Sequence, residues 1–255
     1  MDPTVPAPIQ TWDLPLIRAT GRFSAALGLV SAPLATLAPL RGGFLSPAEV
    51  ARYAGFPADR RRFSFLSGRM AAKAAIGRIH SSARATEIEI GEGVFGQPIV
   101  RGGGIAGCQV TISHTDGMGG AIAFPEEHPM GLDLESVRPE SDLTIESQMS
   151  SREMALLRGL PFDPSTNRAL GWSMKESLSK VLKCGLMSPF SIFEVQAIDA
   201  KGPVLISTFV NFAQYQVLSV SFGRAVLSIA LPKKTNLALD FLLDRNALGT
   251  LRAAD

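Results

Sequence analysis

The sequence predicts an α+β protein, a pseudodimer of two similar halves that each pack a helix on an antiparallel sheet, with the functional site in the cleft between them. Three observations support this prediction. The composition, with 46% hydrophobic and 19% charged residues in a chain of 255, is that of a globular protein with one large domain or two small ones. A pattern of one helix followed by short apolar strands occurs twice. The two occurrences are separated by a nearly constant spacing.

The repeated pattern can be followed segment by segment. The first copy has a helix, a strand, a turn segment and two paired strands at 63–79, 86–90, 96–100, 109–114 and 119–124; the second has them at 170–184, 193–198, 202–206, 216–221 and 224–230. Gln109 precedes Gln216 by 107 positions, and Gly96 precedes Gly202 by 106. We interpret the match as an internal duplication, the alternative being a chance similarity between two helix-and-meander units.

The duplication suggests how the chain is divided. We expect an N-terminal α+β half at 21–127 and a C-terminal α+β half at 128–240. The Pro-rich segment 1–20 is interpreted as an N-terminal extension and 241–255 as a C-terminal tail, because their composition is mixed and peripheral in character. Two similar halves that pack face to face leave a cleft between them, which is a natural place for a ligand.

Charge and cysteine content exclude several classes of protein. A formal net charge of +2 is too small for a dedicated nucleic-acid binder. Two cysteines without CxxC spacing argue against a disulfide framework or a structural zinc site and fit a reducing compartment. The first residues lack a secretory signal, and the most apolar segment, 24–40, is interrupted by Gly28, Pro33 and Pro39 and too short to span a bilayer. We interpret that segment as a buried strand followed by a loop, and we expect a cytoplasmic monomer that binds neither membranes nor nucleic acids.

A pair of carboxylates stands at the start of the second half, in the segment GLDLES at 131–136. Alternate side chains of a strand share a face, so Asp133 and Glu135 project together while Leu132 and Leu134 project into the core. Neighbouring carboxylates repel each other unless a cation lies between them, and ligation by oxygen atoms alone favours magnesium. The alternative is a solvated edge strand.

Two further segments carry groups that bind phosphate. Ser113 and His114 end an apolar strand just before a glycine-rich turn, where a ligand can approach the backbone. Arg62, Arg69 and Lys73 follow one another at helical spacing, and Arg60 and Arg61 precede them. The alternatives are a histidine at the rim of a hairpin and an ordinary solvated basic face.

The helix predicted at 170–184 has two distinct stripes. One stripe is apolar and is typical of a core-facing side: Leu170, Met174, Leu178, Val181 and Leu182. The opposite stripe has Trp172 among charges, followed by Glu176, Lys180 and Lys183 at spacings of four, four and three residues. An exposed tryptophan beside a surface Glu–Lys pair is one interpretation, and a second buried side is the other.

Taken in order, these segments resemble the large, surfactin-synthetase type of 4′-phosphopantetheinyl transferase. The resemblance rests on the basic helix with its GRxAAK run at 68–73, GxP at 96–98, ISHT at 112–115, GLDLE at 131–135 and WSMKESLSK at 172–180. It implies a pseudodimer that binds coenzyme A in the cleft between its halves. It also implies transfer of phosphopantetheine to a serine of an acyl or peptidyl carrier protein, with release of adenosine 3′,5′-bisphosphate.

The resemblance also implies roles for individual residues. Magnesium and the diphosphate of coenzyme A would be held by Asp133, Glu135 and Glu176. Contacts to the rest of coenzyme A would come from Arg62, Arg69, Gln97, Ser113, His114, Lys175 and Lys180. Glu176 would accept the serine proton, and Lys180 would offset charge on the leaving phosphate. Gln97 stands where the family commonly has Lys or Arg, which implies a weaker phosphate contact at that position.

Two other functions remain compatible with the residues alone. One is a different magnesium-dependent phosphoester enzyme with water as the nucleophile, which the D-x-E pair permits. The other is a non-catalytic protein of the same fold that binds coenzyme A or a carrier protein. The sequence does not distinguish fatty-acid, polyketide, peptide or siderophore carriers.

Overall fold

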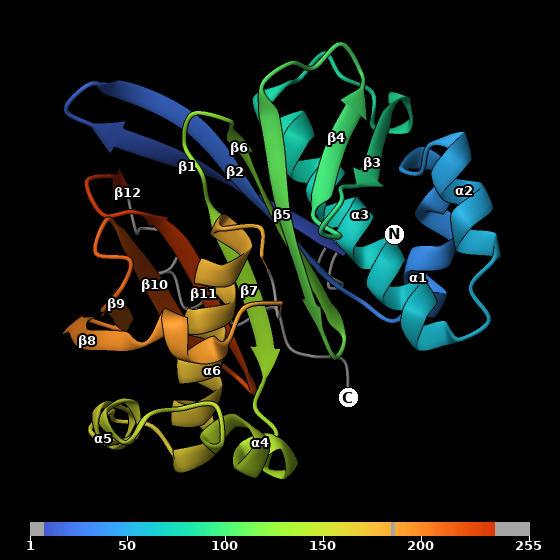
Figure 1. Cartoon of the computed structure of the whole chain (residues 1–255). Coiled ribbons are helices and arrows are strands. Elements are labelled where there is room, and N and C mark those ends of the chain that lie inside the picture. The colour runs from blue at the N-terminus through green and yellow to red at the C-terminus, as the bar shows by residue number, and fades with distance from the viewer. Residues whose placement is uncertain (1–7, 185–186, 238–255) are drawn as a thin grey trace.

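The computed structural model describes residues 8–184 and 187–237, in which two antiparallel sheets pack face to face (Figure 1). The first sheet has the order β12 (Asn236–Leu237), β1 (Ile9–Arg18), β2 (Gly21–Ser31), β6 (Met118–Pro125) and β5 (Cys108–Thr115). The second has the order β7 (Gly131–Ser136), β11 (Ala225–Pro232), β10 (Tyr215–Phe222), β9 (Val204–Phe209) and β8 (Val195–Lys201). A separate hairpin pairs β3 (Ile88–Glu92) with β4 (Pro98–Gly102).

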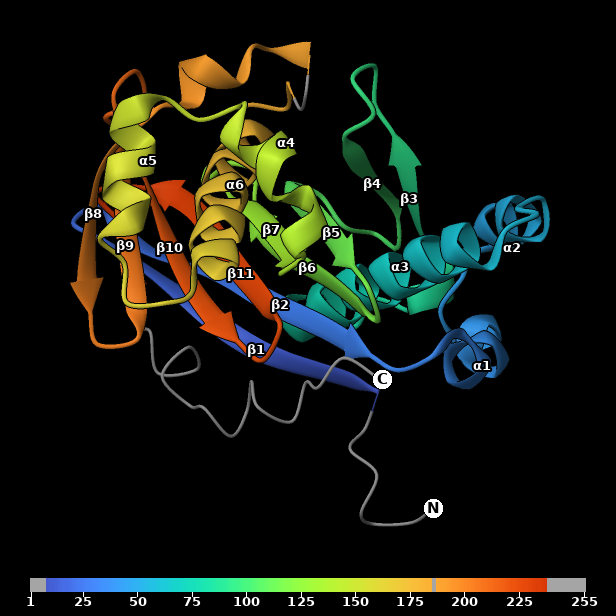
Figure 2. The same cartoon turned by 90° about the horizontal axis from the view of Figure 1, so that it is seen from below.

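Each sheet carries one long helix on its outer face, so the apolar residues form three layers. Leu14, Leu27 and Ile122 of the first sheet meet Leu132 and Leu227 of the second in the central layer. α3 (Asp59–Ile79) covers the other face of the first sheet, and α6 (Pro164–Val181) covers the other face of the second. The shorter helices are α1 (Leu34–Leu37), α2 (Pro47–Ala54), α4 (Asp142–Glu146) and α5 (Ser151–Arg158), and Figure 2 shows α2 beside α3 and α5 beside α6.

Local sequence explains where α6 begins and how closely both long helices approach their sheets. Asp163 caps α6 by accepting a hydrogen bond from the Thr166 N–H at 3.0 Å, and Pro164 fits the first helical position, where no N–H is needed. A Cβ atom on Gly131 of β7 would lie 2.0 Å from the Ser177 carbonyl oxygen of α6. A Cβ on Gly28 of β2 would lie 2.3 Å from the Ala71 carbonyl oxygen of α3. Glycine is therefore required where each helix crosses its sheet.

The predicted internal repeat is visible in the topology. β2-β6-β5 and β7-β11-β10 have the same neighbour order, and each runs alongside its helix at an equivalent glycine. β5 and β6 span 108–115 and 118–125, while β10 and β11 span 215–222 and 225–232. The registers also correspond, because Cys108 pairs with Pro125 and Tyr215 pairs with Pro232. The two α+β halves thus share one plan.

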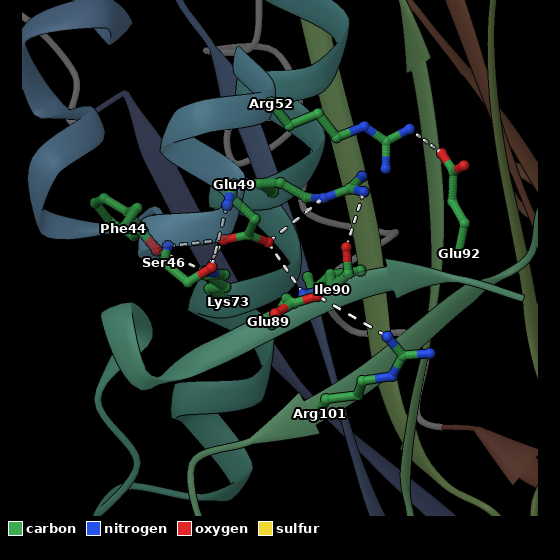
Figure 3. A network of polar contacts seen from close by, with 10 residues as sticks. Phe44, Ser46, Glu49, Arg52, Lys73, Glu89, Ile90, Glu92 and Arg101 are labelled. Atoms are coloured by element: carbon green, nitrogen blue, oxygen red, sulfur yellow. Dashed lines mark hydrogen bonds and ion pairs between the residues drawn. The ribbon is translucent and has the colours of Figure 1, made fainter. Parts of the chain in front are cut away.

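A buried polar network is repeated as well. In the first half Ser46 and Glu49 form a capping box at the start of α2, and the Glu49 carboxylate pairs with Lys73 of α3 and accepts from the Ile90 N–H (Figure 3). In the second half the same contacts join Ser150, Glu153, Lys175 and the Val195 N–H. Each network joins three elements of its half: the short helix (α2 or α5), the long helix (α3 or α6) and one strand (β3 or β8).

The ends of the chain differ from the expected division. Residues 9–18, which we had placed in an N-terminal extension, form β1, pair along their whole length with β2, and bury Leu14 and Leu16 completely. β12, near the end of the second half, pairs with β1 of the first sheet at Leu16↔Leu237. The buried strand expected within 24–40 is present as part of β2, but α1 and a 3-10 helix follow it where a loop was expected. The tail at 241–255 lies outside the described residues.

Among the described residues, no helix has the length and apolar character needed to cross a bilayer.

Candidate active site

The candidate site lies where the edges of the two sheets meet. β5 and β7 are edge strands of different sheets, and Figure 1 shows them side by side near the centre of the molecule. Hydroxyl groups of β5 connect them: Thr111 Oγ1 accepts from the Leu132 N–H at 3.1 Å, and Ser113 Oγ accepts from the Leu134 N–H at 3.1 Å. Thr111 and Ser113 are two residues apart, so their side chains point to the same side of β5. Their two contacts fix the position of β7 along β5, and we call this line of contact the seam.

Asp133 projects from β7 at the seam and meets a lysine from α6. Lys180 Nζ donates to Asp133 Oδ1 at 2.8 Å and to Ser113 Oγ at 2.9 Å, and Ser113 Oγ donates to Asp133 Oδ1 at 3.0 Å. Asp133 is 5% exposed, and its Oδ2 is buried without a hydrogen-bond partner among the described residues. A buried carboxylate oxygen in that state calls for a cation or a water molecule.

Glu135 and Glu176 flank Asp133 and are electrostatically coupled to it. Burial raises the pKa of Glu135 to about 7, and the charge of Asp133 adds to the effect. Burial also raises the pKa of Glu176, again with a contribution from Asp133 and against the opposing charge of Lys180. Carboxylates that raise one another's pKa are stabilised in their charged form by a cation.

The chemistry of the donor set suits magnesium, but the three carboxylates are not arranged around a common point in this structure. Three carboxylates and the unpartnered Oδ2 of Asp133 supply the oxygen ligands that magnesium prefers. In the described part of the chain, no group of three or more His, Cys, Asp or Glu side chains is arranged so that it could hold a metal ion. At Asp133 Oδ1 the positive charge is supplied by Lys180.

These groups line one cavity of about 450 Å³ that is formed by both halves. Its first-half wall comes from α3, β5, the end of β3 and the turn after it, and its second-half wall comes from β7 and α6. The polar and aromatic residues that the sequence analysis singled out and that line it together are Arg61, Arg69, Ser113, His114, Asp133, Glu135, Trp172, Glu176 and Lys180. The expected cleft between the halves is therefore present, and most of the expected site residues converge on it.

The two stripes of the helix with Trp172 are confirmed. Leu170, Met174 and Leu178 are fully buried against the second sheet. Trp172 and Glu176 are half-buried on the cavity side, and the Trp172 ring stacks on Phe190 with their centroids 4.5 Å apart. The helix thus has one side in the core and a second side in the cleft.

Lys175, which the sequence analysis placed among the coenzyme A contacts, is directed elsewhere. Its side chain is fully buried, and Nζ donates to the Gln148 carbonyl oxygen at 3.0 Å and pairs with Glu153 at 3.0 Å. The expectation for Lys175 is corrected accordingly, because it lies inside the second half and not on the cavity wall. Lys73, which was expected on a basic face of the helix, is likewise buried and pairs with Glu49.

Arg62 and Gln97 are close to the cavity without lining it. Arg62 Nε donates to the Phe56 carbonyl oxygen at 2.7 Å, which directs the guanidinium back along its own half. Gln97 lines an adjoining cavity of about 200 Å³, which shares Gly96 and Lys180 with the first. Gln97 Oε1 accepts from the Phe95 N–H within the hairpin turn. Neither position contributes a charge to the larger cavity.

Two residues that shape the site, Thr111 and Glu49, were not predicted from the sequence. Thr111, which holds β7 in place, has no local signature, because its role depends on two sheets meeting. Glu49, which lies behind Arg69, could have been found from the S-x-x-E pattern at 46–49, a capping-box signature that recurs at 150–153.

Comparison with known proteins agrees with this picture. Residues 129–230 match the family model of the 4′-phosphopantetheinyl transferase superfamily. The predicted resemblance to this superfamily is confirmed. None of the curated proteins matches the chain.

Two solved structures are similar to part of the chain. A holo-(acyl-carrier-protein) synthase from Bacillus anthracis str. Ames, in complex with CoA (3′,5′-ADP), is 18% identical; the match covers 44% of this chain and 96% of that chain, with a TM-score of 0.34. A holo-ACP-synthase from Plasmodium yoelii is 17% identical; the match covers 46% of this chain and 95% of that chain, with a TM-score of 0.35.

Proposed function

We propose that this protein transfers the 4′-phosphopantetheine arm of coenzyme A to a serine of an acyl or peptidyl carrier protein, in the manner of the large, surfactin-synthetase type. One observation carries the proposal: Asp133, Glu135, Glu176 and Lys180 converge on one cavity between two similar halves. All four lie within the segment 129–230: Asp133 and Glu135 form the D-x-E motif on β7, and Glu176 and Lys180 stand one helical turn apart on α6.

The residues that would hold magnesium are the three carboxylates. Asp133 offers its unpartnered Oδ2, and burial together with the charge of Asp133 raises the pKa of both Glu135 and Glu176. When bound, magnesium supplies positive charge that stabilises the charge developing on the phosphoryl oxygens. Lys180 provides one positive charge beside Asp133. This charge supports a site that binds an anionic ligand next to its own carboxylates.

The chain's own residues account for the rest of the reaction. The serine hydroxyl of the carrier attacks the phosphorus that bears pantetheine, its proton passes to Glu176, and the bond from that phosphorus to the adenosine phosphate breaks. Burial raises the pKa of Glu176, which makes it a stronger base for this proton. Lys180, with a side chain 24% exposed, is placed to offset charge on the leaving adenosine 3′,5′-bisphosphate.

Binding of coenzyme A would use the basic and hydroxyl groups of the first half. Arg69, Ser113 and His114 line the first-half side of the cavity, where Ser113 is hydrogen-bonded to Asp133. Arg60 and Arg61 stand in the first turn of α3, and Arg61 lines the cavity, so both would attract an acidic carrier protein. We place the reaction in the cytoplasm and expect a monomer, because one chain supplies both walls of the site.

The proposal is tested by incubating the protein with coenzyme A, magnesium and an apo carrier protein, followed by mass spectrometry of the carrier. We expect the carrier to gain one phosphopantetheine group while adenosine 3′,5′-bisphosphate appears in equal amount. Cleavage of coenzyme A without modification of any carrier would indicate the phosphoester enzyme instead. Binding of coenzyme A without cleavage would indicate a non-catalytic protein.

A further inference from the structure

Glu49 is a buried acid that the proposed reaction does not use. Its side chain is 3% exposed, and its carboxylate faces donors from three elements (Figure 3). Oε2 accepts from the Ser46 N–H at 2.9 Å and from Lys73 Nζ, while Oε1 accepts from the Ile90 N–H at 3.0 Å. The same Oε1 lies 3.7 Å from Arg69 Nε, so Glu49 is the counter-charge nearest to that arginine.

Arg69 connects this network to the cavity. Its side chain is only 11% exposed, its guanidinium carbon lies 4.5 Å from the centroid of the Phe65 ring, and Nη2 donates to the Ile90 carbonyl oxygen at 3.0 Å. No hydrogen bond joins Nη1 to another described residue, and Arg69 lines the cavity that contains Asp133. Nη2 is thus held by a hydrogen bond, whereas Nε is buried without a hydrogen-bond partner among the described residues and interacts with Glu49 through charge alone.

Charge determines which conformation of Arg69 is stable. Burial lowers the pKa of Arg69, and the charge of Glu49 is the largest influence in the opposite direction. A buried cation without its counter-charge tends to move toward water. Removing the negative charge of Glu49 would leave Lys73 and Arg69 as two neighbouring buried cations, and Arg69 is the one with an opening through which to turn away.

The second half contains the same network without the arginine. Glu153 accepts from the Ser150 N–H and the Val195 N–H and pairs with Lys175, as Glu49 does with its own partners. Four residues before Lys73 stands Arg69, whereas four residues before Lys175 stands Gly171. The repeat therefore separates two roles: both glutamates hold their halves together, and only Glu49 also faces an arginine of the cavity.

We infer that Glu49 is a positioning residue that holds the Arg69 guanidinium toward the cavity, where Arg69 binds a phosphate group of the substrate. The inference rests on the proposed function, because coenzyme A supplies that phosphate. The second half provides a matched control, since Glu153→Gln weakens an equivalent network that holds no arginine.

The test combines two measurements on the full chain. In the first, the Arg69 Nε–Hε resonance, identified by its loss in Arg69→Lys, is followed by NMR exchange with solvent. We expect slow exchange in the native protein and in Glu153→Gln, and much faster exchange in Glu49→Gln. Slow exchange that persists in Glu49→Gln would overturn the positioning role, whether or not coenzyme A binds.

In the second measurement, the dissociation constant of coenzyme A is determined for Glu49→Gln, Arg69→Ala and the double variant, each at a temperature where it remains folded. We expect each single change to weaken binding about tenfold, the scale of one charge-assisted contact, and the double variant to be no weaker than Arg69→Ala. Additive losses, or an equal loss in Glu153→Gln, would overturn the inference.

Absence of coenzyme A binding by the native protein would refute the proposed function and the phosphate as ligand, while the exchange measurement still decides the link between Glu49 and Arg69. If Glu49→Gln does not fold, Glu49→Asp, which keeps the charge and shortens the reach, replaces it in both measurements.

Discussion

At Asp133 the two carboxylate oxygens have different surroundings. Oδ1 accepts hydrogen bonds from Ser113 and Lys180, whereas Oδ2 is buried and has no hydrogen-bond partner among the described residues. Leaving a buried carboxylate oxygen unpartnered is unfavourable by about 1–3 kcal/mol or more, so a protein keeps such a group where a ligand will satisfy it. Glu135 and Glu176 lie on the same side and add negative charge.

The first prediction concerns this oxygen. Asp133→Asn keeps the size of the side chain and removes one ligand charge, so carrier modification should fall by roughly 100-fold or more. The far-ultraviolet circular dichroism spectrum should stay that of the native protein. EDTA should abolish modification by the native protein, and added magnesium should restore it. Full activity in metal-free buffer, or collapse of the fold in Asp133→Asn, would contradict the proposed role of Asp133.

The second prediction separates Lys180 from its neighbours on α6. Lys180→Ala removes countercharge without removing the candidate base, so we expect weaker coenzyme A binding and a fall in turnover smaller than that of Glu176→Gln. Lys183→Ala serves as the control, because Lys183 follows the end of α6 and its side chain is exposed. Equal effects of the two lysine variants in calorimetry and turnover would remove Lys180 from the mechanism.

At the scale of elements, the site depends on two close contacts: β5 against β7, and β7 against α6. The first contact is made by hydroxyl groups that accept backbone N–H donors, and the second by a glycine at the crossing point. Both contacts lie within two residues of Asp133. Small shifts of either element would therefore separate Asp133 from Glu176 and Lys180.

The third prediction tests the crossing of β7 and α6. Gly131→Ala places a methyl group 2.0 Å from the Ser177 carbonyl oxygen, so α6 must move. The free energy of unfolding should fall by about 1–3 kcal/mol or more, and turnover should fall with it. Gly77→Ala on α3 is the control, because nothing lies within 4 Å of the added methyl group. That variant should gain about 1 kcal/mol from helix propensity. Equal urea unfolding midpoints for the two variants would show that β7 and α6 can move apart without loss of stability.

The fourth prediction tests the seam. Thr111→Val leaves the buried Leu132 N–H without its acceptor, which should lower the free energy of unfolding by about 1–3 kcal/mol. Thr111→Ser keeps the hydroxyl and should lose much less. Urea unfolding of both variants decides the point, and a larger loss in Thr111→Ser than in Thr111→Val would mean that the methyl group of Thr111, rather than its oxygen, holds the strands.

Across the whole molecule, the duplication has kept its framework and differentiated its chemistry. Gly28 and Gly131 occupy equivalent crossing points, yet two and four residues later β2 and its continuation have Val30 and Ala32 where β7 has Asp133 and Glu135. After Lys73 comes Ala74, whereas after Lys175 comes Glu176. Because the acids stand in one half only, one chain should contain one site. Calorimetry should find a single coenzyme A per monomer, and two equal sites would contradict this account.

Much of this arrangement could be predicted from local patterns. The D-x-E alternation on a strand, the Trp172 stripe on a helix and the repeat spacing each follow from short-range geometry, and they correctly brought Asp133, Glu176 and Lys180 to one cleft. Lys175 could not be placed in this way, because neighbours on a helix point roughly 100° apart and only the packed partner Glu153 shows which way it faces. The pairing of β1 with β12 could not be predicted either, since it joins segments at opposite ends of the chain, and the local hairpin of β1 with β2 was also missed.

The most direct test of the central claim is the turnover of an apo carrier protein by Glu176→Gln, measured where the variant remains folded. Glutamine keeps the shape of the side chain but removes both the ligand charge and the proton acceptor in the cavity. We predict that transfer of phosphopantetheine falls by roughly two to four orders of magnitude while the unfolding midpoint changes little. Near-normal transfer by the folded variant would show that Glu176 does not take part and would contradict the assignment of the active site to the cavity between the two halves.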